Sequence, residues 1–202
     1  MCIVQFKEAQ IIKRVFSLLL IFSLLSVLPC NLSAFDSKRK GFVLGFGAGP
    51  GFTSYSSDYY PYSKSTLGMV TDFKIGLGVS DRLLILYSNK VVWFSFQDPV
   101  WGSSQTTLTG ITSVGLSYFF KPTAPCFFIS GGIGGSFWTP FQTTYFSGSW
   151  IGSGFYCGVG YESSPHFYIE ISGILGSGGS NQTDYAGKNP SSIMITLNFL
   201  LY

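Results

Sequence analysis

Apolar residues alternate with glycine and other small residues along most of this chain, and this period of two limits its fold more than any other feature. Between Gly41 and Phe52 the even positions are apolar, whereas the odd positions are largely glycine. Between Leu67 and Val79 the same alternation runs with the opposite parity. Because successive side chains of a β-strand point to opposite faces, each segment is predicted to be a strand with two different environments.

Eight such segments follow one another along the chain: Gly41–Phe52, Leu67–Val79, Leu83–Phe96, Thr106–Phe120, Cys126–Trp138, Trp150–Glu162, Phe167–Gly176 and Ser192–Tyr202. The connections alternate between short turns, at 80–82, 121–125 and 163–166, and long polar loops, at 54–66, 97–105, 140–149 and 177–190. This alternation is typical of outer-membrane barrels, in which the short turns and both termini are periplasmic. An even number of strands also lets the first pair with the last. The predicted fold class is all-β: a closed, antiparallel, up-and-down eight-stranded transmembrane β-barrel.

Composition indicates which face of the strands points outward. Charged residues make up only 10% of the chain and aromatic residues 18%, which leaves too few charges for the outer surface of a soluble barrel. The apolar face is therefore predicted to face lipid, while glycine, serine, threonine and a few charges line the interior. The predicted outward set includes Phe127, Ile129, Ile133, Phe155, Val159, Ile169, Ile171, Ile193, Ile195, Leu197 and Phe199.

The first 34 residues have the parts of a secretory signal peptide. Three basic residues precede an apolar run over residues 15–28, and Ala34 ends a short segment that suits cleavage. A run of about 14 apolar residues is too short to span a membrane as a helix. Residues 1–34 are therefore expected to be a cleaved signal peptide and residues 35–202 the outer-membrane barrel. The alternatives are an uncleaved anchor and lipidation at Cys30.

Four charged residues are predicted to face the lumen: Asp72, Lys74, Lys90 and Glu170. Charges away from water are costly without partners, so these four are expected to pair. A fixed network that plugs the barrel is favoured over a gate, because eight strands leave room for little besides side chains. The third segment poses a problem, because the neighbours Asn89 and Lys90 need a bulge if both are to point inward.

Aromatic residues gather where the predicted strands meet the connections, and they are interpreted as two girdles at the membrane interfaces. The short-turn girdle comprises Phe42, Tyr118, Phe120, Phe127, Tyr161 and Phe167, and the long-loop girdle comprises Tyr55, Trp93, Phe137 and Trp150. The loop at 54–66 supplies the candidate residues for contact with a partner, because aromatic loops on a rigid scaffold suit binding. These candidates are Tyr55, Tyr59, Tyr60 and Tyr62.

The sequence predicts no catalytic residue, metal site or cofactor. His166, the single histidine, falls in a short turn and has no serine and carboxylate in a triad order. The stretch GFGAGPG is not followed by the Lys-Ser/Thr pair and helix of a phosphate-binding loop. Cys126 and Cys157 lie on neighbouring segments with opposite parity, so no disulfide is expected between them.

Several stretches carry a resemblance to a known group of proteins: KGFVLGFGAGPGF, TDFKIGLGVSDRLLILYSNKVVWF, TSVGLSYFF, GGIGGSFW and GFYCGVGYESS. With these strands the chain resembles the small outer-membrane β-barrel superfamily, which includes outer-membrane proteins A and X and the opacity-type proteins. The resemblance implies insertion by the barrel-assembly machinery. Such proteins usually end in an aromatic residue on the lipid face, whereas Tyr202 falls on the face opposite to Ile193 and Phe199.

The favoured function is that of a non-enzymatic outer-membrane protein with a structural or surface-interaction role through its external loops. The alternatives are a narrow pore or small-ligand carrier that uses the charged lumen and, third, a lipid-modifying enzyme. The expected partners are outer-membrane lipid, the assembly machinery and an extracellular partner of the loops. Nucleic acid is not expected, because the chain after residue 34 holds nine basic and eight acidic residues.

Overall fold

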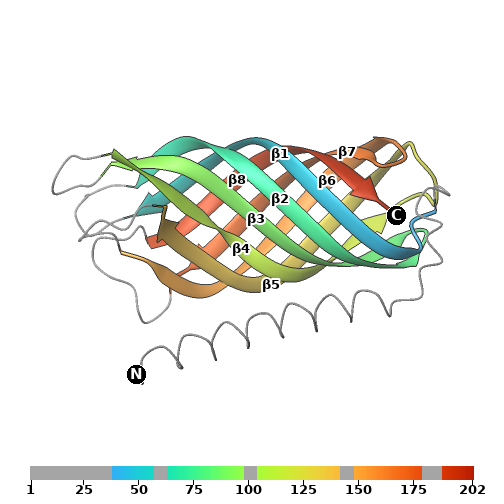
Figure 1. Cartoon of the computed structure of the whole chain (residues 1–202), viewed down its shortest axis with the longest axis horizontal. Coiled ribbons are helices and arrows are strands. Elements are labelled where there is room, and N and C mark those ends of the chain that lie inside the picture. Colours follow the sequence, from blue (N-terminus) through green and yellow to red (C-terminus); the bar gives the residue numbers. More distant parts are fainter. Residues whose placement is uncertain (1–37, 57–62, 98–103, 142–147, 179–187) are drawn as a thin grey trace, which may run out of the picture. The chain divides into compact units, whose positions relative to one another are not determined.

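The computed structural model describes residues 38–56, 63–97, 104–141, 148–178 and 188–202. Eight antiparallel strands form one closed barrel in sequence order (Figure 1), which confirms the predicted fold class. They are β1 (Gly41–Ser56), β2 (Lys64–Ser80), β3 (Leu83–Gln97), β4 (Ser104–Phe119), β5 (Cys126–Pro140), β6 (Trp150–Ser164), β7 (Phe167–Ser177) and β8 (Lys188–Leu201). No helix in the described part of the chain is long and apolar enough to cross a membrane.

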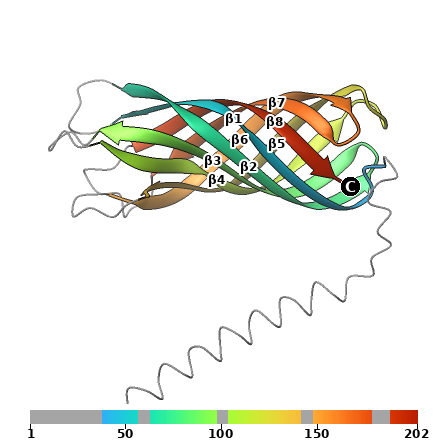
Figure 2. The same cartoon turned by 45° about the horizontal axis from the view of Figure 1, so that its top comes forward.

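The barrel closes where β1 meets β8. Leu44 of β1 lies opposite Ile75 of β2 on one side and opposite Leu201 of β8 on the other. Figure 2 shows β8, in red, running beside β1, in blue. Both edges of each described strand are therefore paired, which removes the open edges that otherwise invite aggregation or are excluded from lipid.

The strands extend further toward the long loops than the hydrophobic pattern predicts. The loop predicted at 54–66 is shorter, because β1 continues to Ser56 and β2 begins at Lys64. In this extension Ser54 lies opposite Ser65, and their hydroxyls are 2.7 Å apart in a hydrogen bond. Backbone pairing thus continues where the side chains have become polar, so the apolar alternation ends before the strand does.

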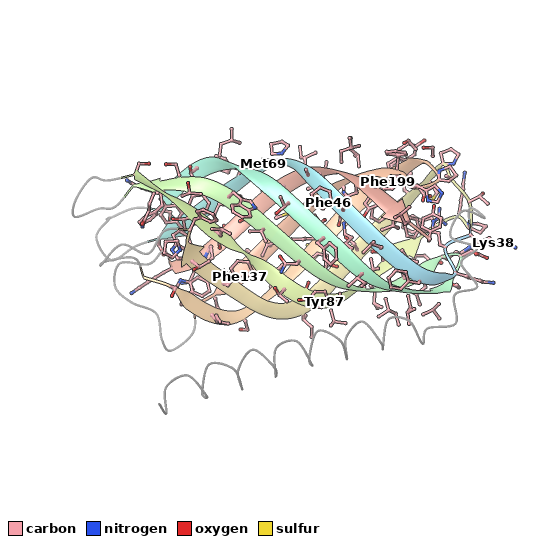
Figure 3. The ribbon with its side chains drawn as sticks, in the orientation of Figure 1. Lys38, Phe46, Met69, Tyr87, Phe137 and Phe199 are labelled. Carbon is pink, nitrogen blue, oxygen red and sulfur yellow. The ribbon has the colours of Figure 1, made fainter. Side chains whose placement is uncertain are left out.

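The outer wall of the barrel is apolar, as predicted. Every member of the predicted outward set is exposed on the barrel surface, and the exposed fraction reaches 75% for Ile133. Figure 3 shows such side chains projecting from the barrel, among them Phe46, Met69 and Phe199. Inward positions of the same strands hold glycine or buried side chains. Side chains that alternate along each strand therefore face either the apolar outer wall or the lumen.

The third strand needs no bulge at Asn89 and Lys90. Its register is continuous there, with Asn89 opposite Phe73 and Lys90 opposite Asp72 of β2. Lys90 points inward and is fully buried. Asn89 points outward, where its side-chain amide donates to the hydroxyl of Thr112 at 3.0 Å. A polar pair on the outer wall therefore accounts for the residue that did not fit the pattern.

Eight of the ten residues predicted to form the aromatic girdles point outward. At the short-turn end all six aromatic residues lie exposed on the outer wall. At the long-loop end Trp93 and Phe137 have outward parity, but Tyr55 and Trp150 are buried in the lumen, with exposed fractions of 4% and 2%. The prediction was wrong for these two because they lie within strands β1 and β6, where position parity decides which way a side chain points. Tyr55 is accordingly not available as a surface contact residue.

Candidate functional site

The middle of the lumen holds the four charged residues singled out in the sequence. Asp72 and Lys74 lie on β2, Lys90 lies on the neighbouring β3, and Glu170 lies on β7. All four are buried. Strand pairing places Asp72 directly opposite Lys90. The side chain of Glu170 points inward from β7 and reaches Lys90 across the lumen. We refer to these four residues as the central network.

Each lysine of the central network contacts both carboxylates. Lys74 Nζ lies 2.6 Å from Asp72 Oδ2 and 2.9 Å from Glu170 Oε2. Lys90 Nζ lies 2.6 Å and 3.2 Å from the same two oxygens. Two positive and two negative charges thus form a compact group without net charge, which offsets part of the cost of removing the ions from water.

Uncharged side chains complete the hydrogen bonding of the central network. Lys74 Nζ donates to Tyr168 Oη at 2.9 Å and to Asn198 Oδ1 at 3.0 Å. Ser130 donates to the second oxygen of Glu170 at 2.6 Å. The network and its partners therefore come from five strands, because β5 and β8 contribute partners in addition to β2, β3 and β7.

An aromatic cluster fills the lumen between the central network and the long loops. Trp138 stands at its middle, with ring-centroid distances of 5.1 Å to Tyr55, 5.4 Å to Phe94 and 5.5 Å to Phe96. The whole cluster comprises Tyr55, Val70, Val92, Phe94, Phe96, Ile111, Trp138, Trp150, Tyr156, Ile174 and Met194. These edge-to-face contacts are favourable, and the large side chains that make them fill the cross-section of the lumen.

A second apolar cluster fills the lumen on the short-turn side of the central network. Phe119 and Phe128 stack at 4.9 Å, and Tyr168 meets Phe128 edge-on at 5.1 Å. The members are Val43, Leu84, Leu86, Phe119, Cys126, Phe128, Tyr168, Leu200 and Tyr202. Apolar layers thus separate the central network from both mouths of the barrel.

A second ion pair, which sequence reasoning missed, closes the short-turn mouth. Arg39 precedes β1 and forms a buried salt bridge with Glu162 at the end of β6. Its Nη1 donates to the carbonyl oxygens of Asp81, Lys121 and Pro122 at 2.7, 3.0 and 3.0 Å. Its guanidinium also lies 4.0 Å over the ring of Phe119. One side chain therefore ties two turns and a strand end together.

The charge of Arg39 is secured by this pairing. Although burial alone would lower it, the adjacent Glu162 carboxylate raises the pKa of Arg39 above its ordinary value. Two sequence signals pointed toward the pair: the run Lys38-Arg39-Lys40 directly before the first strand, and the position of Glu162, which shares inward parity with Tyr156 on β6. No spacing rule joins residues so far apart in the chain.

Tyr202, which directly follows β8, is hydrogen-bonded at the same mouth of the barrel. Tyr202 points inward and donates its hydroxyl to Glu162 Oε1 at 2.8 Å, while the backbone N–H of His166 donates to Tyr202 Oη at 3.3 Å. Burial and the Glu162 carboxylate raise the pKa of Tyr202 to about 12. His166 adopts a φ of 77° in its turn, and its Nδ1 lies 2.8 Å from the carbonyl oxygen of Leu200. The inward phase of Tyr202 thus has a structural reason.

Cys126 is buried in the lumen and Cys157 is exposed on the outer wall, and both are free thiols, as their opposite parity predicted. The candidate contact residues Tyr59, Tyr60 and Tyr62 lie outside the described residues.

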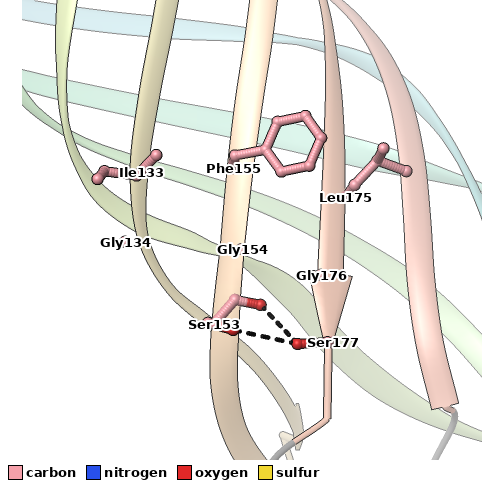
Figure 4. A pocket seen from close by; sticks show the side chains of 8 residues that line it. All are labelled: Ile133, Gly134, Ser153, Gly154, Phe155, Leu175, Gly176 and Ser177. Atoms are coloured by element: carbon pink, nitrogen blue, oxygen red, sulfur yellow. Dashed lines mark hydrogen bonds between the residues drawn. The ribbon is translucent and has the colours of Figure 1, made fainter.

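The outer wall carries a groove between β5, β6 and β7 (Figure 4). Its rim is the apolar row of Ile133, Phe155 and Leu175, and a row of glycines forms its floor. The hydroxyls of Ser153 and Ser177 lie beyond the glycines, 3.2 Å apart. The residues that line the groove include no histidine and no carboxylate.

Solved structures share this architecture. The neisserial surface protein NspA is 15% identical, with a TM-score of 0.52, over 80% of this chain and 96% of its own. The chain has the fold of the small outer-membrane β-barrels. The attachment invasion locus protein Ail of Yersinia pestis, crystallised with the heparin analogue sucrose octasulfate, is 14% identical, with a TM-score of 0.50, over 80% of this chain and 99% of its own. No protein-family model matches the sequence, and no curated protein matches it. The predicted resemblance is thus confirmed at the level of the fold.

Proposed function

We propose that this chain is a non-enzymatic protein of the bacterial outer membrane, with a sealed barrel that acts as a scaffold for its external loops. The observation that carries the proposal is the pairing of an apolar outer wall with a lumen crossed by the central network, two apolar clusters and the Arg39–Glu162 pair. The wall supports membrane insertion, and the filled lumen supports a role that lies outside the barrel interior.

The outer wall supports the membrane location. Large apolar side chains are exposed on every strand, among them Phe46, Leu67, Ile85, Val114, Ile133, Phe155, Ile169 and Leu197. An apolar surface that surrounds a whole barrel is unfavourable in water and suits lipid. With the short turns in the periplasm, the last strand ends on the periplasmic side and the long loops lie on the outer surface of the cell.

The lumen supports a plug rather than a pore. A conducting path has to break the contacts of Lys74 and Lys90 with two carboxylates, displace the cluster around Trp138 and open the Arg39–Glu162 pair. Eight-stranded barrels have room for little besides the side chains found here. We therefore rank the pore or small-ligand carrier below the loop scaffold.

A lipid-modifying enzyme ranks third. His166 is held in its turn by contacts with Leu200 and Tyr202, and the serines of the outer groove lack a lining base. This leaves the external loops as the place of function. Residues 57–62, 98–103, 142–147 and 179–187 contain no lysine or arginine, and Lys64 and Lys188 are the basic residues that flank them, so the loops offer few groups that attract a polyanion. We propose a partner that is not a polyanion.

The sealed lumen is tested by planar-bilayer recording of the purified protein. We expect no steady conductance from the native chain at neutral pH. A stable open channel in the native protein that disappears in a Lys74→Met variant would contradict the plug and favour the pore.

The loop function is tested by adhesion of expressing cells. Cells that display a Tyr59→Ser/Tyr60→Ser/Tyr62→Ser variant should bind less to polystyrene and to an epithelial monolayer than cells with the native chain. The matched control changes three wall residues that do not belong to a loop, Ile151, Leu175 and Ile193, to valine. Equal adhesion of the loop variant and the native chain would count against a role for this loop.

A further inference from the structure

Four basic residues outside the lumen gather at the short-turn end of the barrel. Lys38 and Lys40 precede β1, Arg82 lies in the turn between β2 and β3, and Lys121 lies in the turn between β4 and β5. All four are exposed, and Figure 3 shows Lys38 at this end. Among the described residues, Asp81 is an acidic neighbour of these four, and its carboxylate lies 3.6 Å from Lys40 Nζ. We call the four residues the basic collar.

We propose that the basic collar binds the phosphate groups of anionic phospholipids in the membrane leaflet at the short-turn end. This inference rests on the proposed membrane location and adds a lipid class and a leaflet to it. Lysine and arginine near a membrane surface attract anionic headgroups, and phosphate oxygens accept the hydrogen bonds of their side chains. A zwitterionic lipid offers the same phosphate without the net charge.

Arg39 holds the collar together. Its guanidinium donates to the carbonyl oxygen of Asp81, the residue before Arg82, and to that of Lys121 itself. Lys38 and Lys40 are its own neighbours in the chain. One buried side chain therefore fixes the three segments that carry the four charges, so the collar is a built feature rather than a chance gathering of mobile side chains.

The aromatic residues of the wall place the collar at headgroup depth. Tyr118 and Phe120 pack edge-on at 5.8 Å, and Phe127 packs on Tyr161 at 4.9 Å, both at the short-turn end and both exposed on the outer wall. Tyrosine and other aromatic rings favour the interface between acyl chains and headgroups. Basic residues that lie nearer the end of the barrel than these aromatic residues are therefore at the depth of the lipid phosphates.

The opposite end of the barrel has the opposite charge character. The loops at 57–62, 98–103 and 179–187 each contain one aspartate, and none of them contains a basic residue. Lys64 and Lys188, at the ends of β2 and β8, are the basic residues of the described strands nearest to those loops. The central lysines are already engaged with carboxylates. The short-turn end therefore carries four exposed basic residues, whereas the ends of the described strands near the long loops carry two, Lys64 and Lys188.

Electron spin resonance of spin-labelled lipids tests the inference. The purified full barrel is reconstituted in phosphatidylcholine bilayers that contain a trace of spin-labelled phosphatidylglycerol or spin-labelled phosphatidylcholine, and the motionally restricted fraction gives the relative association constant. We expect at least about a twofold preference for phosphatidylglycerol, because each basic residue near the surface contributes a several-fold factor. The preference should fall in 1 M salt, at about a 3 Å Debye length.

Paired variants locate the effect. Arg82→Gln/Lys121→Gln should lose at least half of the preference, whereas the matched Lys64→Gln/Lys188→Gln should keep it. Equal affinity for both lipids in the native protein, or equal losses in the two variants, would overturn the proposal, as would a collar that binds an acidic protein without any lipid preference. A barrel that restricts neither lipid would instead contradict the membrane location.

Discussion

Replacement of Arg39 by methionine should destabilise the barrel strongly. Methionine keeps much of the unbranched volume of the side chain but removes the charge and every donor. Arg39 is 1% exposed, as is its partner Glu162, so the loss leaves a buried carboxylate whose remaining contacts are Tyr202 Oη at 2.8 Å and Cys126 Sγ at 3.7 Å.

The expected loss of stability follows from the cost of leaving one buried ion without its partner, compared with burying the two as a pair. Breaking a buried ion pair by removing one partner costs about 3–5 kcal/mol. The three turn carbonyls that lose the Arg39 hydrogen bonds contribute less to the loss of stability. The turns that carry them lie at the mouth of the barrel, where water can replace the lost donor. We expect the free energy of unfolding to fall by about 3–5 kcal/mol in Arg39→Met.

Urea titration in lipid vesicles, followed by the gel mobility of unboiled samples, measures this change. The matched control is Lys40→Met, the adjacent residue, whose pair with Asp81 is exposed and should contribute about 0–1 kcal/mol. The double variant Arg39→Met/Glu162→Gln should recover much of the loss, because it removes the unpaired charge. The reasoning is refuted if Arg39→Met is no less stable than Lys40→Met, or if the double variant is no more stable than the single one.

Three further outcomes are expected. Lys90→Met should lower the free energy of unfolding by about 3 kcal/mol, measured by the same titration, because two carboxylates then share one lysine. Gly49→Ala should cost about 1–3 kcal/mol, because its Cβ meets a backbone carbonyl oxygen at 2.0 Å, whereas Gly131→Ala, with its nearest atom at 3.4 Å, should be tolerated. Tyr202 has a pKa raised to about 12, so its stabilisation is complete below pH 10 and is lost as pH rises toward 12; Tyr202→Phe should therefore lose less stability than the native chain between pH 9 and pH 11.5, and an equal loss would contradict the assignment.

The barrel was predictable from the sequence because period-two alternation acts locally, residue by residue. It placed the strands, their order and the outward face, and it identified Asp72, Lys74, Lys90 and Glu170 as inward residues. It failed where an apolar run stops before backbone pairing does. Tyr55 was assigned to a loop for that reason, although β1 continues past it and its parity directs it into the lumen. Trp150 was assigned to an interface girdle although it begins β6 and its parity also directs it into the lumen.

The mouth of the barrel was not predictable in the same way. Arg39 and Glu162 are 123 positions apart in sequence, and they meet only because eight strands close on themselves. The inward phase of Tyr202 could be read from the sequence, but its reason could not, since that reason is a hydrogen bond to Glu162. Contacts of this kind depend on closure, which a pattern along one strand does not encode.

One measurement tests directly whether the chain forms a closed barrel in the outer membrane. Cells expressing the full chain are fractionated, and the outer-membrane fraction is run on a gel with and without boiling. The protein should appear in the outer-membrane fraction and should migrate faster before boiling than after it, because the folded barrel resists the detergent. A soluble product whose migration does not change on boiling would contradict the account.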